Sequence, residues 1–192
     1  MSMRAFSIVK PLLVVLPFAA LSGCVFSPKD NVTTTTISYD PASQARIRVY
    51  GSGYVLDKSN CYIEDPHLAS KNISNAVKIQ FFLKPESNSI GMPKVPNQRR
   101  GIFDEYVITA GASVAVQNRH AETHQIGNMI SKSNCNPGGV IFAPQAGKNY
   151  ESEIEIKDGF CKIKLYEIHS DGSINTSASV PFVSAEKCAP TK

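Results

Sequence analysis

Two histidines with a carboxylate between them form the segment of this sequence best suited to bind a metal ion. The residues are His120, Glu122 and His124. On a helix, side chains four residues apart share a face, so His120 and His124 could hold one transition-metal ion while Glu122 would point away. We predict a short helix over residues 118–130. The commoner interpretation is a polar surface with incidental histidines, because no third ligand is evident from the sequence.

Motifs of the common enzyme classes do not appear in the sequence. The histidine pair is not the His-Glu-x-x-His of metalloproteases, and there is no Gly-x-Ser-x-Gly turn to present a nucleophilic serine. The glycines at 51–53 and 138–139 do not lead into a helix, as a phosphate-binding loop must. We therefore expect a non-catalytic protein without a cofactor.

Four of the five cysteines form an even set of widely spaced residues, which indicates two disulfides in an oxidising compartment. The absence of Cys-x-x-Cys argues against zinc. Three pairings are open. If the strand after Cys135 pairs with the strand before Cys161, these two cysteines meet, and Cys61 pairs with Cys188 by elimination.

The fifth cysteine closes an N-terminal segment with the layout of a secretory signal. Arg4 and Lys10 supply a positive start, and residues 11–21 form an apolar run too short to span a bilayer as a helix. The run ends in Leu21-Ser22-Gly23-Cys24, which resembles the lipobox of bacterial lipoprotein precursors. The resemblance implies cleavage before Cys24, a thioether-linked diacylglycerol on its sulfur, and acylation of the new amino group.

The residue after the lipidated cysteine bears on localisation. In the lipoprotein family, Asp at this position usually retains the protein in the inner membrane, whereas this chain has Val25. The resemblance therefore implies an outer-membrane lipoprotein of a Gram-negative bacterium, held by its lipid anchor, on either the periplasmic or the surface face.

The charge of the chain argues against nucleic-acid binding. The formal net charge is +4, and two of the cations lie in the signal segment, so the mature chain would carry only +2. A nearly neutral chain without a basic cluster lacks the concentrated positive charge that displaces counterions from nucleic acid.

The remaining pattern predicts three parts: a signal peptide (1–23), a lipidated and flexible tether (24–44) and one β-sandwich (45–192). Short alternating runs rich in Val, Ile, Thr and Tyr, separated by regular turns, are typical of an all-β, antiparallel sandwich of the immunoglobulin or transthyretin-like kind. Residues 142–150 are similar to the FxPxxGxxY pattern of small transthyretin-like or PEGA-like modules. Residues 104–110 and 113–117 are predicted to form a hairpin.

The clearest hairpin turns at Asp158-Gly159, a two-residue type I′ signal. This turn sets Lys157 opposite Phe160, and the register then pairs Glu155 with Lys162 on a face that we expect to be solvated. The opposite face of the same hairpin carries an apolar row.

One long connection, residues 84–101, contains three prolines and two glycines and cannot be a regular helix or a central strand. Long loops on rigid scaffolds often carry recognition. We predict a partner-binding surface on this loop, for an envelope protein or peptidoglycan, formed by Ile90, Met92, Lys94, Arg99 and Arg100. The sequence thus favours a non-catalytic binding or structural module in the cell envelope, with metal binding through His120 and His124 as the alternative.

Overall fold

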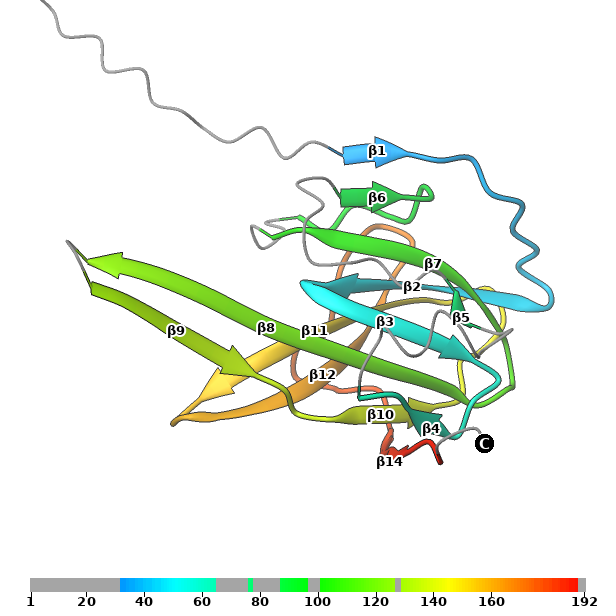
Figure 1. Ribbon diagram of the computed structural model, residues 1–192. Helices are drawn as coiled ribbons and strands as arrows, with labels where there is room; N and C mark the ends of the chain where they lie inside the picture. Colours follow the sequence, from blue (N-terminus) through cyan, green and yellow to red (C-terminus); the bar gives the residue numbers. More distant parts are fainter. Residues whose placement is uncertain (1–31, 65–75, 78–86, 97–100, 127–128, 190–192) are drawn as a thin grey trace, which may run out of the picture.

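The computed structural model describes residues 32–64, 76–77, 87–96, 101–126 and 129–189, and within these ranges the protein is built of strands without a helix (Figure 1). The all-β prediction is confirmed. No helix in the described ranges is long and apolar enough to cross a bilayer. The predicted signal helix and Cys24 lie outside these residues.

The first sheet has six strands and mixes parallel with antiparallel neighbours. β1, β6 and β7 run parallel to one another, β2 is parallel to β11, and the other two pairings are antiparallel. In spatial order its strands are β1 (Val32–Thr34), β6 (Ser87–Ser89), β7 (Phe103–Thr109), β2 (Gln44–Tyr50), β11 (Asn149–Lys157) and β12 (Phe160–Ile168).

The second sheet is antiparallel throughout. Its path runs through β13 (Val183–Ser184), β10 (Gly139–Phe142), β8 (Val114–Ile126), β3 (Ser52–Asp57) and β5 (Ala76–Val77), and β9 (Met129–Cys135) pairs with the outer half of β8. A small third sheet joins β4 (Cys61–Tyr62) to β14 (Glu186–Lys187).

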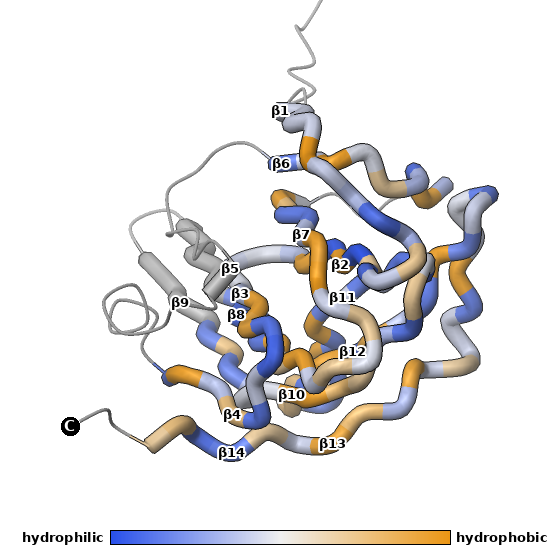
Figure 2. Tube along the Cα trace, turned by 90° about the vertical axis from the view of Figure 1, so that its right-hand side faces the viewer, coloured by the Kyte–Doolittle hydropathy of each residue, from blue (hydrophilic) through white to orange (hydrophobic). Residues whose placement is uncertain are grey.

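The core lies between the two large sheets, and strand alternation determines which residues enter it. On β2, Ala45, Ile47 and Val49 are at most 1% exposed and face the second sheet. Figure 2 shows apolar stretches along the strands of both sheets. Burial of these side chains supplies the main stabilisation of the sandwich, at roughly 25 cal/mol per Å² of apolar surface. Their partners from the other strands include Val55, Tyr106, Val116, Phe142 and Leu165.

Both predicted disulfides are present, Cys61–Cys188 and Cys135–Cys161. The Cys135–Cys161 disulfide was predicted from a pairing between the strand after Cys135 and the strand before Cys161, and this strand pairing was wrong. β10 pairs with β8 and β13 in the second sheet, whereas β11 belongs to the first sheet. Cys135 ends β9 and Cys161 lies on β12, so this disulfide links the two sheets. Cys61–Cys188 secures β14 to β4 near the C-terminus.

Three further predictions are corrected by the structure. Residues 118–126 and 129–130 belong to β8 and β9 rather than to a helix, because β-sheet pairing overrides the local preference of this polar stretch. β7 and β8 do not form a hairpin, since the chain crosses between the sheets at Gly111. The predicted flexible tether does not hold for all of residues 24–44, because β1 already pairs with β6 from Val32 onward.

The β11–β12 hairpin has the predicted register, with Lys157 opposite Phe160. Asp158 and Gly159 both have positive φ, as a type I′ turn requires. The outer face of this hairpin is only partly solvated, in contrast to the prediction. Glu155 is accessible and pairs with Lys162, whereas Glu151 and Glu153 further along the strand are buried.

Candidate functional site

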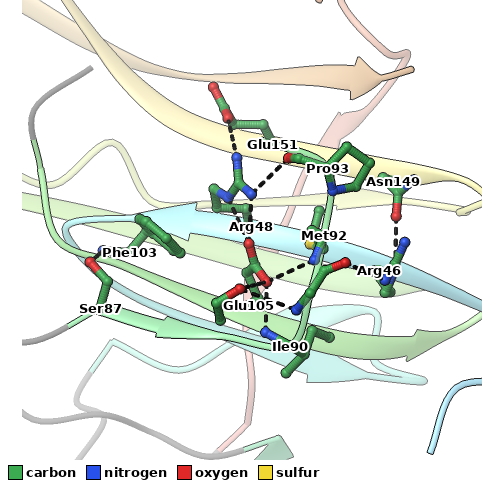
Figure 3. A network of polar contacts seen from close by, with 12 residues as sticks. Arg46, Arg48, Ser87, Ile90, Met92, Pro93, Phe103, Glu105, Asn149 and Glu151 are labelled. Carbon is green, nitrogen blue, oxygen red and sulfur yellow. Dashed lines mark hydrogen bonds and ion pairs between the residues drawn. The ribbon is translucent and has the colours of Figure 1, made fainter. Parts of the chain in front are cut away.

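A segment of the predicted binding loop crosses the outer face of the first sheet. We call this segment, residues 89–96, the strap. Its first residues bond to one carboxylate on β7: Glu105 Oε2 accepts hydrogen bonds from Ser89 Oγ (2.9 Å), Ile90 N (2.7 Å) and Met92 N (3.2 Å) (Figure 3). Three donors on one charged oxygen hold the strap backbone against the sheet.

The other oxygen of Glu105 binds an arginine that is almost completely buried. Arg48 donates to Glu105 Oε1 through Nε (2.9 Å) and Nη2 (2.6 Å), and Nη2 also donates to the carbonyl of Pro93 (3.0 Å). Arg48 Nη1 lies 3.6 Å from Glu151 Oε2 on the neighbouring strand. The guanidinium also stacks over the ring of Phe103, 4.9 Å from its centre. We call Arg48, Glu105 and Glu151 the buried triad.

The far end of the strap meets the turn after β12. Gly172 has a φ of +83°, and a Cβ added there would come within 1.9 Å of the carbonyl oxygen of Lys94. Only glycine allows this close approach of two backbones. The strap therefore runs from β7 over β2 to the Ser170–Ser173 turn.

A cavity of about 470 Å³ opens between the strap, β1 and the start of β7. Its walls combine apolar groups with one accessible cation, Lys94, and the edge of the buried triad. Both oxygens of Glu105 are engaged by the strap and by Arg48, so this carboxylate is committed to structure and is poorly placed for proton transfer. The lining of the cavity consists of Val32, Thr34, Arg48, Ser89, Gly91, Met92, Lys94, Gly101, Phe103 and Glu105.

The predicted partner-binding residues of the loop divide into three groups. Met92 is 5% exposed and lies in the wall of the cavity rather than on the outer surface. Ile90 is half-buried, and Lys94 is exposed at the cavity. Arg99 and Arg100 lie outside the described residues. The described part of the loop, residues 89–96, is therefore fixed to the sheet, and Lys94 is an accessible cation within it.

The predicted metal site loses its geometric basis. His120 and His124 lie on β8, where they pair with Cys135 and Ser131 of β9. Along a strand, residues four apart have Cα atoms about 13 Å from each other, whereas the prediction assumed the one-turn spacing of a helix. Among the residues that the structure describes, no group of three potential metal-binding side chains occurs.

A second cavity, about 530 Å³ in volume, lies between the end of β12 and the segment before β13. Glu167 there binds Lys148 Nζ at 2.6 Å and lies 3.8 Å from His169 Nδ1. The hydrogen bond and charge of Glu167 raise the pKa of Lys148. Burial raises the pKa of Tyr150, whose hydroxyl accepts a hydrogen bond from the backbone of Gln145.

Comparison with protein-family models, with curated proteins and with solved structures gives no significant match. The site is therefore interpreted from its own geometry. Sequence reasoning missed the buried triad, although one signal was present: charged residues recur on the outer face of three strands that become neighbours, at Arg48, Glu105 and Glu151. The sequence does not reveal that these three strands are neighbours, because that depends on the strand order in the sheet.

Proposed function

We propose that this protein is a lipid-anchored, non-catalytic binding or structural module of the bacterial cell envelope, attached to the outer membrane through Cys24. The observation that carries the proposal is the position of the lipobox relative to the fold. Cys24 precedes the first strand, which begins at Val32, by only eight residues. An anchor so close to a disulfide-bonded β-domain matches an exported protein held at a membrane surface.

The anchor is tested on the protein made in a Gram-negative host. The intact mass of the N-terminal fragment should correspond to a triacylated Cys24, and the protein should sediment with outer-membrane fractions. Cys24→Ala should abolish the acyl mass and release the protein from membranes. An unmodified cysteine in the membrane fraction would contradict the proposal.

For the binding role, we propose an envelope protein or cell-wall glycan as the partner, recognised at the cavity beside the strap. Lys94 is the accessible charge there, so Lys94→Glu is the direct test. Deleting the loop would not separate recognition from folding, because the strap supplies donors to Glu105 and its loss would leave this buried carboxylate without them. Crosslinking in intact envelopes should recover a partner with the native protein and less of it with Lys94→Glu.

The matched control for this experiment is Lys187→Glu, on the small third sheet at the C-terminal side of the molecule. Lys187 pairs with Glu64 in an exposed ion pair and is not a residue of the cavity. If both variants recover the same amount of partner as the native protein, recognition does not use the cavity.

A further inference from the structure

The strand registers place the entry of the chain and the ends of several strands at one end of the first sheet. Val32 of β1 is level with Ser87 of β6, and Phe103, which bonds to Ser87 Oγ through its backbone NH, is level with Tyr50 of β2. The starts of β1, β6 and β7 and the end of β2 therefore share one end. We call it the entry end, because the chain from Cys24 arrives there.

Two hairpins extend beyond the strand ends that make up the entry end. Val49 is paired with Ser152, so β11 continues past the level of Tyr50 to Lys157, a projection of about 13 Å. In the second sheet, Ser52 pairs with Arg119, and β8 continues with β9 to Ile126, a projection of about 23 Å. Figure 1 shows the β8–β9 and β11–β12 hairpins extending toward the side where β1 begins.

Several exposed apolar side chains lie toward the entry end, on strands from β1 to β12. Among the described residues, seven large apolar side chains are exposed, and four of them lie here: Phe160 (81%), Ile156 (53%), Val32 (45%) and Ile102 (43%). Phe160 follows the β11–β12 turn directly and points away from the core. Single exposed apolar residues are common, but Phe160 and Ile156 lie close together at the β11–β12 tip, and we take this tip as the part of the end that something else covers.

The length of chain between Cys24 and Val32 limits how far the entry end can lie from the membrane that holds the anchor. Seven residues lie between Cys24 and Val32, and the eight fully extended Cα–Cα steps from Cys24 to Val32 span at most about 29 Å. This reach exceeds the projection of both hairpins, so their tips can touch the plane that holds the anchor. It also keeps the entry end close to that plane in every orientation of the domain.

We propose that the entry end docks on the lipid bilayer, with Phe160 and Ile156 at the β11–β12 tip inserted among the acyl chains next to the headgroups. This inference rests on the proposed lipid anchor. Lys157 and Lys162 flank the tip and can remain at the headgroup level while the apolar side chains insert. The docking orients the second cavity and the C-terminal sheet relative to the membrane.

The chain contains no tryptophan, so single Trp substitutions report one position each. The test uses the full lipidated protein in phosphatidylethanolamine–phosphatidylglycerol vesicles whose acyl chains are brominated. Phe160→Trp should be quenched roughly twofold relative to unbrominated vesicles, because interfacial side chains reach the headgroup–acyl boundary. Ile102→Trp serves as a second probe of the same end and should be quenched more weakly.

The matched control is Ala146→Trp, exposed in the connection before β11 and so at the opposite end of a nine-residue strand. Its emission should not respond to bromine. Equal quenching at both ends, or none at Phe160→Trp in protein of triacylated mass, would overturn docking and leave the anchor standing. A dimer in which Phe160→Trp is shielded from bromine would assign the surface to a second copy instead. Protein without acyl mass would overturn the anchor and the docking together.

Discussion

Two charge clusters lie on the same outer face of the first sheet, and they differ in how far their side chains are exposed to water. The buried triad places one cation, Arg48, between two carboxylates under the strap, with side chains at most 8% exposed. The second cluster places one carboxylate, Glu155, between Lys162 and Lys164, which are 60% and 25% exposed. Each cluster includes a carboxylate of β11: Glu151 belongs to the buried triad and Glu155 to the exposed cluster. Glu153 lies between these two residues on the same face of the strand.

The comparison shows that the position of a charge on a strand does not decide its contribution to stability. An exposed ion pair adds little to the free energy of unfolding, because water screens the two charges and the paired side chains lose conformational freedom. A buried cluster gains strong hydrogen bonds but has lost its hydration, so removing one member leaves the others uncompensated. The strap accounts for the difference in burial, because it covers the buried triad and leaves Glu155 and Lys162 accessible to water.

The largest expected effect comes from removing the cation of the buried triad. Arg48→Ala leaves Glu105 and Glu151 as buried, like-charged neighbours, and we expect the free energy of unfolding to fall by about 3–5 kcal/mol. Urea denaturation of the two proteins measures it. Lys162→Ala is the control from the exposed cluster and should leave the midpoint nearly unchanged. Similar losses in both variants would mean that the strap does not exclude water from the triad.

A smaller effect is expected where the strap meets the Ser170–Ser173 turn. Gly172→Ala would force a methyl group against the carbonyl of Lys94 and keep a strained φ, at a cost of about 1–3 kcal/mol. Hydrogen exchange at the amides of Ile90 and Met92 should accelerate, because the strap loses its far attachment. Gly159→Ala is the matched control: its φ is also positive, at +79°, but no atom lies within 4 Å of the added group. Equal exchange rates in the two variants would refute an attachment at Gly172.

The smallest effect concerns the exposed cluster and its pH dependence. The hydrogen bond from Lys162, aided by the charges of Lys162 and Lys164, lowers the pKa of Glu155 from its ordinary value of 4.5. A carboxylate with a lowered folded-state pKa stabilises the fold above its unfolded pKa, and this contribution disappears as the pH falls through the folded value. Carbon-detected NMR titration should show the pKa of Glu155 rising toward 4.5 in Lys162→Ala. An unchanged titration would show that Lys162 does not hold this carboxylate in solution.

Much of the sandwich was predictable because its signals are local. The alternation of Ala45, Ile47 and Val49 determines the core face of β2, and Asp158-Gly159 determines the register of a whole hairpin. The even set of cysteines was correctly paired, although from a wrong neighbour relation. The polar stretch around His120 was predicted wrongly, since strand pairing with β9 is a long-range property that no local preference reveals.

By itself, the sequence determined the strand pattern, the disulfide-bonded class and the signals from which we infer a lipid anchor, because each depends on residues close together in the chain. Only the tertiary structure decided what covers the polar face. Arg48, Glu105 and Glu151 come from three strands far apart in sequence, and they become one buried triad because β2 lies between β7 and β11 and the strap crosses above them. Burial is a property of such neighbours, so the difference between a solvated arginine and a buried one appears only when the sheet is assembled.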